Sequence, residues 1–356
     1  MKQIILFVAC LMTALAGFSQ RVITVEKNNA QSLLEAIRQA NEMNADVNAQ
    51  RLYILIPNGF YDLGDRVLTK ITGHHIALIG QGMDGTIIRN CPEAKNEGIS
   101  KTAVFQNRGT NNYFQDLTLH NALDYYSCGA AGRAVTLHDK GTRTICNRVC
   151  LMSYQDTYYS DYEQAQHYMK DSEIHGTVDF ICGAGDVWFE CCRIVTEKRS
   201  SDGSGRNVIA APRTEGTDWG YIFNRCTIEN IVSTFQYARG WHTTPRCIML
   251  NTTLITPEKL DAPRFDANGM RTVQSYFKEY NTMDASGRNI TPESNKVTFV
   301  LYNKEGEITE QNTVETIFTD EEAKAYTVSN VFKDWQPEDI IKQTEMEVKK
   351  LFGEKR

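Results

Sequence analysis

The sequence predicts an all-β protein built as a parallel β-helix, a solenoid in which each coil stacks its strand on the strand of the previous coil. Six segments share one pattern, in which an apolar residue is followed three and five positions later by small or aliphatic residues. Their starts lie 32, 23, 20, 34 and 26 residues apart, and most of them end in the alternation typical of strands. A β-sandwich would not repeat one pattern at such coil-like intervals. The segments are residues 114–119, 146–151, 169–174, 189–194, 223–228 and 249–254.

The region before the repeats completes the N-terminal end of this solenoid. Residues 30–43 predict an amphipathic helix that caps the open end of the β-helix. Residues 52–56 and 76–79 are short apolar runs and predict early strands.

The region after the repeats is expected to be less regular. Past Lys259 the pattern fades, and residues 320–332 predict a C-terminal helical tail with Asp320 as its N-cap. No linker rich in Pro, Ser or Gly divides the chain, so we expect residues 20–356 to form a single domain.

The first nineteen residues have the layout of a secretory signal peptide. Lys2 supplies the charge, residues 4–15 are almost continuously apolar, and small residues follow up to an expected cleavage after Ser19. We therefore expect an exported protein, located in the periplasm, at the cell surface or outside the cell.

Composition excludes several classes of protein. Lys and Arg number 38 against 44 Asp and Glu, so the net charge of -6 gives no basic footprint for nucleic acid. Past the N-terminus no apolar run approaches the roughly 20 residues of a membrane-spanning helix. Of ten cysteines, Cys10 lies in the signal segment, and the spacings of the others match no CxxC pair. We expect most of them to pack as small apolar residues, and we expect no metal site.

The repeat register brings two aspartates together. Asp156 and Asp179 each lie five positions past the last aliphatic residue of a repeat, and equivalent positions on stacked coils are about 4.8 Å apart. Two carboxylates this close cannot both ionise freely, so one should keep its proton while the other stays charged. A protonated acid beside an ionised nucleophile is typical of covalent acid–base catalysis. The spacing fits equally well a surface pair beside an arginine or a bound cation.

The neighbouring residue types are unusual for a surface pair. Gln155 places an amide donor directly before Asp156, and Asp179 stands in an otherwise apolar strand, where an unpaired charge is costly. Arg239 is a candidate partner for that charge, and Trp241 offers a flat face for a sugar ring.

At these residues the chain resembles the pectin methylesterases, a family of carbohydrate esterases with a right-handed parallel β-helix fold. The run YQDTYY at 154–159 resembles the family's YQDTLY, GTVDFICG at 176–183 resembles GTVDFIFG, and ARGW at 238–241 resembles GRPW. These three motifs occur in order and at compatible spacing, and the similarity spans roughly residues 22–337. The stretch at 318–337 resembles the tail of secreted bacterial members.

The resemblance implies an enzyme that hydrolyses the methyl esters of galacturonate units in pectin, or methylesterified homogalacturonan, and releases methanol. It assigns Asp179 as the nucleophile and Asp156 as the general acid that later serves as base. It assigns Gln155 as a hydrogen-bond donor to the tetrahedral oxyanion. No cofactor and no metal are implied, and we expect a monomer without a nucleic-acid partner.

The resemblance also implies four substrate-binding residues. Arg239 would pair with Asp179 and keep it ionised and oriented. Trp241 and Tyr159 would line the sugar groove, and Thr102 falls where the family has a Thr that contacts substrate.

The chain departs from the family at several positions. Arg133 opens RAVTL where the family has QAVAL, whose Gln is a second oxyanion donor. Arg133 can replace this donor, or it can point into solvent and leave the donor lost. Cys182 replaces an aromatic residue that contacts substrate. Two cysteines that plant members join near the site fall at Val149 and Ser172, so that disulfide cannot form.

Other functions remain open from the residues themselves. A pectin-cutting glycoside hydrolase with retaining geometry also needs two carboxylates about 5 Å apart. A calcium-dependent lyase would need several converging acidic ligands. A non-catalytic pectin-binding protein could keep the groove after losing the oxyanion donor at Arg133. A serine esterase is disfavoured because the sequence lacks Gly-x-Ser-x-Gly.

Overall fold

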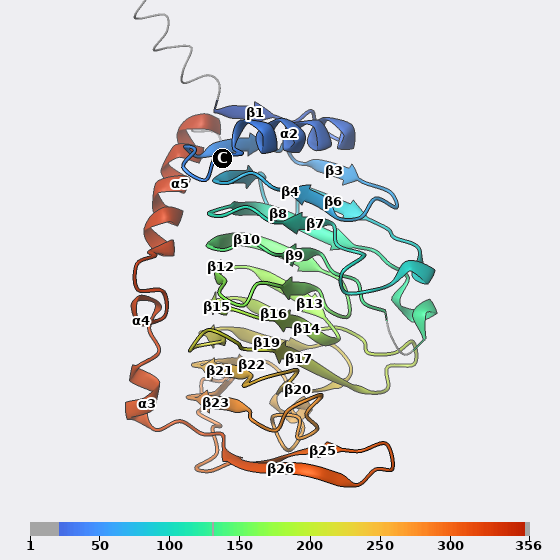
Figure 1. Cartoon of the computed structure of the whole chain (residues 1–356), viewed down its shortest axis with the longest axis vertical. Coiled ribbons are helices and arrows are strands. Elements are labelled where there is room, and N and C mark those ends of the chain that lie inside the picture. Colours follow the sequence, from blue (N-terminus) through green and yellow to red (C-terminus); the bar gives the residue numbers. More distant parts are fainter. Residues whose placement is uncertain (1–20, 130–131, 353–356) are drawn as a thin grey trace, which may run out of the picture.

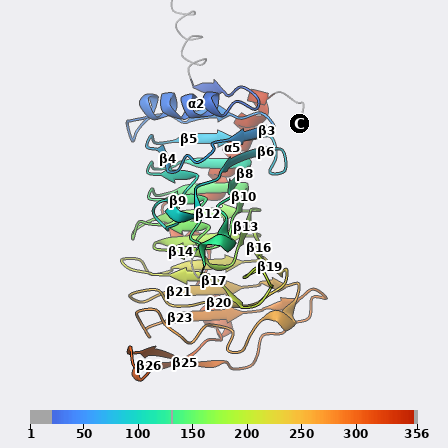
Figure 2. The same ribbon diagram turned by 90° about the vertical axis from the view of Figure 1, so that its right-hand side faces the viewer.

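The computed structural model describes residues 21–129 and 132–352. Within them the chain winds into the expected right-handed parallel β-helix, whose coils stack along the long axis of the molecule (Figures 1 and 2). The expected signal peptide, including Cys10, lies outside the described residues.

Each full coil contributes to three walls of parallel strands. The first wall contains β1 (Val22–Thr24), β2 (Leu52–Leu55), β5 (Ile76–Ile79), β8 (Tyr113–Asn121), β10 (Thr144–Met152), β12 (Gln166–Lys170), β15 (Asp186–Glu190), β18 (Tyr221–Asn224), β21 (Arg246–Leu250) and β23 (Tyr276–Tyr280). The second contains β3 (Gly59–Asp62), β6 (Thr86–Asn90), the ends of β8 and β10, β13 (Glu173–Gly176), β16 (Arg193–Thr196), β19 (Thr227–Asn230), β22 (Thr253–Leu254) and β24 (Met283–Asp284). The third contains β4 (Thr69–Ile71), β7 (Phe105–Asn107), β9 (Leu137–Asp139), β11 (Tyr158–Ser160), β14 (Val178–Gly183), β17 (Arg206–Pro212) and β20 (Thr234–Ala238).

The observed strand register confirms the predicted repeat. The first residues of the six segments pair from strand to strand along the first wall, so they form one column inside the solenoid. Two of them, Phe189 and Phe223, stack their rings 4.5 Å apart at an interplanar angle of 6°. Stacking these side chains away from water is the main source of stability in a coil that cannot bury its apolar face alone. The column consists of Phe114, Cys146, Met169, Phe189, Phe223 and Met249.

The N-terminal elements agree with the sequence. Helix α2 (Ala30–Met43) has the predicted bounds and begins at Asn29, whose side chain accepts a hydrogen bond from the backbone N–H of Ser32. Its buried face, which includes Leu33 and Ile37, contacts the first strands and closes that end of the core (Figure 1).

The C-terminal expectations need correction. The predicted helix at 320–332 is two short helices, α3 (Asp320–Lys324) and α4 (Val328–Phe332), because Thr327 caps a new helix. The N-cap of α3 is Thr319, which forms a capping box with Glu322, and not Asp320. The coils also continue past Lys259 in β23 and β24. An antiparallel hairpin then follows, which the sequence did not predict, formed by β25 (Lys296–Tyr302) and β26 (Ile308–Glu315).

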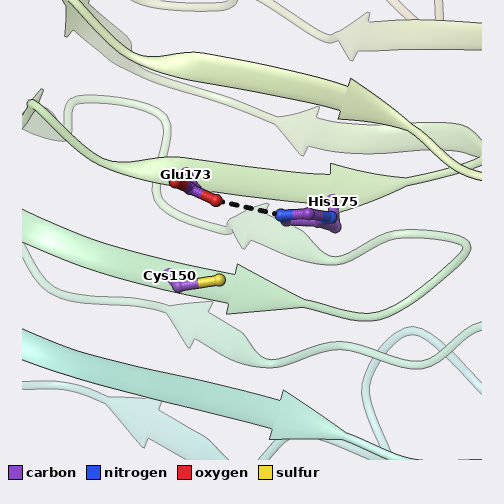
Figure 3. Close-up of side chains that lie close together, drawn as sticks. All are labelled: Cys150, Glu173 and His175. Carbon is purple, nitrogen blue, oxygen red and sulfur yellow. Dashed lines mark hydrogen bonds and ion pairs between the residues drawn. The ribbon is translucent and has the colours of Figure 1, made fainter. Parts of the chain in front are cut away.

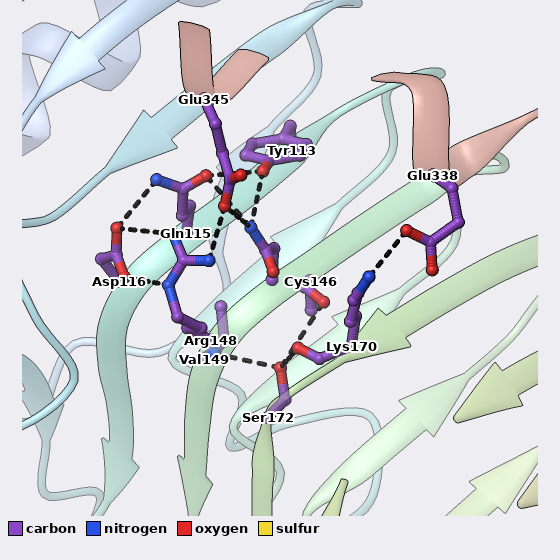
Figure 4. Close-up of polar contacts among 11 residues, drawn as sticks. Tyr113, Gln115, Asp116, Cys146, Arg148, Val149, Lys170, Ser172, Glu338 and Glu345 are labelled. Atoms are coloured by element: carbon purple, nitrogen blue, oxygen red, sulfur yellow. Dashed lines mark hydrogen bonds and ion pairs between the residues drawn. The ribbon is translucent and has the colours of Figure 1, made fainter. Parts of the chain in front are cut away.

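The C-terminal segment returns along the outside of the first wall, and helix α5 (Pro337–Phe352) lies beside the N-terminal coils (Figure 1). Its apolar residues Ile341 and Val348 join a buried cluster on the outer face of that wall. Glu345 accepts a hydrogen bond from Arg148 at 2.6 Å, and Glu338 accepts one from Lys170 at 2.7 Å (Figure 4).

The cysteines within the described residues form no disulfide. Cys146, Cys192 and Cys226 pack in the main core, as the sequence predicts for most cysteines of this chain. Val149 and Ser172, which replace the paired cysteines of plant members, do lie in contact, because the Val149 N–H donates to the Ser172 hydroxyl at 3.0 Å (Figure 4). No helix in the described part is long and apolar enough to cross a membrane.

Short 3₁₀ turns interrupt three of the connections: η1 (Ala94–Asn96), η2 (Tyr125–Cys128) and η3 (Pro257–Lys259). The first two lie in loops that lead into the third wall, and they contact each other.

Candidate active site

A pocket of about 220 Å³ opens on the third wall, and it gathers residues from four of the sequence motifs. Its polar side chains come from the ends and starts of strands on neighbouring coils, where the repeat register brings them together. The residues that line it are Ile99, Arg133, Gln155, Asp156, Asp179, Cys182, Ala211, Arg239, Trp241 and Met270.

Asp156 and Asp179 lie on adjacent coils in the register that their spacing predicts. Tyr158 of β11 pairs with Ile181 of β14, an offset of 23 residues that places Asp156 opposite Asp179. Both aspartates have positive φ values, 60° and 52°, in the left-handed region that few residues other than glycine adopt. They stand where the coil turns from the second wall into the third, and this turn directs both carboxylates into one pocket. Such local strain is concentrated at functional sites.

The environments of the two carboxylates differ. Asp156 is only 4% exposed, and its burial, together with the charge of Asp179, raises its pKa well above the ordinary value. Asp179 instead accepts two hydrogen bonds from Arg239, with Nε to Oδ1 at 2.8 Å and Nη2 to Oδ2 at 2.5 Å. A planar guanidinium fork of this kind stabilises the ionised carboxylate. The pocket therefore favours a protonated Asp156 beside an ionised Asp179.

Arg133 lines the pocket beside Gln155, with which it forms an isolated parallel bridge. Its Nε and Nη2 donate to the carboxylate of Glu97 at 2.8 and 2.6 Å, so the side chain is held in place and its charge is paired. Only the Nη1 group of this fork remains for another acceptor. Sequence reasoning missed Glu97, because nothing in the spacing relates position 97 to position 133.

The predicted substrate-binding residues do not all reach the pocket. Trp241 lines it, and the Tyr159 ring lies 6.1 Å behind the Trp241 ring, with only 6% of Tyr159 exposed. Thr102 is fully buried, and its hydroxyl accepts from the Val135 N–H and lies 3.1 Å from the carbonyl oxygen of Arg133. Thr102 therefore holds the backbone beside the pocket and offers no surface to a ligand.

Asp161 organises a second polar cluster, which sequence reasoning also missed. Burial would raise its pKa, but hydrogen bonds from His138, Lys140 and Tyr159 hold it well below the ordinary value. Arg213 donates to the same carboxylate at 2.8 Å and lies 5.7 Å from the centre of the Trp241 ring. This cluster fixes the wall behind Trp241 and adds positive charge beside the pocket.

The model of the Pectinesterase family matches residues 22–331 of this chain. Probable pectinesterase/pectinesterase inhibitor 42 of Arabidopsis thaliana is 29% identical over 195 residues, which are 53% of this chain and 36% of the relative. Probable pectinesterase 49 of Arabidopsis thaliana is 25% identical over 235 residues, or 65% of this chain and 62% of the relative. The chain thus spans less than two thirds of these relatives.

Solved structures share the fold. The pectin methylesterase of Erwinia chrysanthemi superposes with a TM-score of 0.65 at 20% identity, covering 89% of this chain and 97% of the other. The carrot enzyme gives a TM-score of 0.65 at 19% identity, covering 87% and 92%. A pectin methylesterase crystallised with a hexasaccharide gives 0.65 at 20% identity, covering 88% and 98%. With the family model matching most of its length, the chain belongs to the pectinesterase family.

Proposed function

We propose that this protein is a carboxylic ester hydrolase that removes methyl esters from the galacturonate units of pectin and releases methanol. Membership of the pectinesterase family supports this reaction class. The single observation that carries it is the pair of buried aspartates in one pocket, of which Arg239 engages only Asp179. This asymmetry supplies one nucleophile and one proton donor.

In the first half of the reaction, Asp179 attacks the ester carbonyl carbon, and negative charge develops on the carbonyl oxygen. Gln155 donates a hydrogen bond to this oxyanion, an interaction worth a few kcal/mol of barrier in comparable sites. As the tetrahedral intermediate collapses, the bond to the methoxy oxygen breaks and Asp156 gives that oxygen its proton. Methanol leaves, and the galacturonate acyl group stays on Asp179.

In the second half, the now ionised Asp156 takes a proton from water while the water oxygen attacks the acyl carbon. The bond to Asp179 breaks, which restores its carboxylate and the proton on Asp156. Arg239 holds Asp179 oriented throughout, and Trp241 provides a face for the sugar ring. Arg133 can add a second donor to the oxyanion only through Nη1, because Glu97 holds its other two nitrogens.

Methanol release from methylesterified pectin tests this function. Wild-type chain should release methanol, and the Asp179→Ala variant should lose the activity because no acyl group can form. Arg264→Lys, which alters an ion pair with buried Glu279 outside the pocket, serves as a control and should remain active. Release that persists undiminished in Asp179→Ala would exclude Asp179 as the nucleophile.

The same digests separate the alternative chemistries. A glycoside hydrolase would raise the number of reducing ends, and a lyase would produce an unsaturated product that absorbs in the ultraviolet. A non-catalytic binding protein would retain pectin on a column and release nothing. Gln155 beside Asp156, and an arginine fork on one acid of the pair, favour the esterase.

The chain is proposed to act outside the cytoplasm as a monomer. The charge, apolar run and small residues of residues 1–19 support a signal peptide, with residues 20–356 as a single exported domain. Fractionation of expressing cells, with N-terminal sequencing of the exported form, checks both the route and the cleavage after Ser19.

A further inference from the structure

Three potential metal ligands lie together on the outer face of the second wall, away from the pocket that holds the two aspartates. Cys150 of β10 pairs in register with Glu173 of β13, and His175 follows two residues later on the same strand (Figure 3). Leu151 and Ile174, which alternate with them, face the core. Strand alternation therefore turns all three side chains outward onto one patch.

We propose that Cys150, Glu173 and His175 form a binding site for a divalent transition-metal ion, and that zinc is the ion it fits best. One ligand atom from each residue lies within 4.8 Å of the other two. Two ligands of a tetrahedral zinc at about 2.0–2.1 Å are separated by roughly 3.4 Å. His175 Nε2 and Glu173 Oε2 are 3.3 Å apart, which is long for a charged hydrogen bond but close to that separation.

The partners outside this triad suit metal ligation. His175 Nδ1 lies 2.7 Å from Glu197 Oε1, which fixes the ring and turns Nε2 toward the other two ligands. Zinc-binding histidines commonly have such a carboxylate on the second ring nitrogen. Glu173 is oriented in the same way, because Arg193 Nη1 donates to it at 2.9 Å.

The chemistry of the triad selects among ions. A thiolate, an imidazole and a carboxylate form a mixed set that suits zinc and disfavours calcium or magnesium, which prefer oxygen ligands alone. Burial lowers the pKa of His175, but hydrogen bonds with Cys150 and Glu197 raise it to about 10, so these surroundings stabilise a positive charge. Arg193 is the cation that already faces the patch, and it is held mainly by Glu229 at 2.6 Å. Three protein ligands leave the fourth position to water.

An ion at this position would join two coils just before the candidate nucleophile. β13 continues from His175 into the turn that carries Asp179, and the His175 carbonyl already accepts from the Thr157 hydroxyl at 2.7 Å. We therefore assign the ion a structural role, which holds β10 against β13. This inference is independent of the proposed function, because it concerns binding and stability and requires no ester hydrolysis.

Cobalt and zinc titrations of the chain, stripped of metal with a chelator, test the site. Co²⁺ should bind in one equivalent and give a thiolate-to-cobalt charge-transfer band. Cys150→Ser should abolish the band, and Glu197→Gln should weaken binding about 10- to 100-fold, as expected for a residue that orients a ligand. Cys191→Ser, which changes an exposed cysteine on another turn, should leave the titration unchanged. Excess Ca²⁺ or Mg²⁺ should not displace the cobalt.

A band that survives in Cys150→Ser, or a wild-type chain that binds no cobalt, would overturn the proposal. Circular dichroism shows whether each variant folds. If Cys150→Ser does not fold, X-ray absorption of the zinc-loaded wild type decides, since one sulfur neighbour at about 2.3 Å is expected together with nitrogen and oxygen. No sulfur neighbour, or more than one, contradicts the assigned triad.

Discussion

Replacing Arg239 with Gln should reveal how far the asymmetry of the two aspartates depends on one guanidinium. The substitution removes both charge-assisted hydrogen bonds to Asp179, a residue that is only 6% exposed. Removing one partner from a fully buried ion pair costs about 3–5 kcal/mol. The Arg239 side chain is 27% exposed, so water screens part of this interaction and we expect about 2–3 kcal/mol. Expressed in the reaction barrier, that is roughly 30- to 150-fold in kcat/KM.

The substitution should also shift the pH dependence. Activity requires an ionised Asp179 and a protonated Asp156, so the profile is a bell set by the two apparent pKa values of the coupled pair. Arg239 lowers the pKa of Asp156 and forms an ion pair with the carboxylate of Asp179. Its removal disfavours negative charge on both acids, so both limbs of the bell should move to higher pH. Arg239→Lys keeps the charge and should move the limbs less.

Methanol release measured across pH on esterified pectin provides both quantities. Arg264→Gln is the matched control, because Arg264 makes an equally close pair with the buried Glu279 but lies outside the pocket. That variant should lose stability and keep the pH profile. If Arg239→Gln stays within threefold of wild type and its limbs do not move, the proposed division of roles between the aspartates is wrong.

Three further perturbations separate the roles of charge and packing. Asp156→Asn should suppress methanol release while removing a pH-dependent loss of stability: the folded pKa is raised above the ordinary 3.8, so wild-type unfolding free energy falls as pH rises through that window and the variant's should not. Glu97→Gln removes a negative charge that raises the Asp156 pKa, so the basic limb of the activity profile should move to lower pH, opposite to the effect at Arg239; an alkaline shift would contradict this. Ile341→Ala should cost about 2–5 kcal/mol in urea unfolding, whereas Glu345→Gln, at a 40% exposed ion pair, should cost about 1 kcal/mol or less. Equal losses at these two positions would mean that charge, and not apolar burial, holds α5.

The repeat made the fold and the central acid pair predictable from sequence. An apolar column such as Phe189 and Phe223 can be read directly, because every coil must bury the same face in the same register. Once that register is known, it fixes which residues meet on neighbouring coils. Asp156 and Asp179 could therefore be brought together without knowledge of their side-chain geometry. Their roles still rest on the family resemblance and on the experiments above.

Contacts made by loops could not be predicted in this way. Glu97 reaches Arg133 from a connection whose length is independent of the repeat, so no periodic signal relates the two positions. Thr102 falls next to a pocket residue in space, but its strand turns the hydroxyl to the backbone. The hairpin β25–β26 lies beyond the last coil, where the register no longer constrains the chain.

The Cys150 triad shows what a register argument adds to motif searching. Motif spacing predicted no zinc site, because familiar motifs place their ligands within one turn or helix, a few residues apart. In a solenoid the relevant spacing is instead the length of one coil, here the 23 residues that separate Cys150 from Glu173 and also Asp156 from Asp179. The same coil length thus sets two clusters at once, one in the pocket and one on the outer face. Inserting or deleting a single residue between β10 and β13 would shift both together, whereas changes in the loops outside that coil leave both in place.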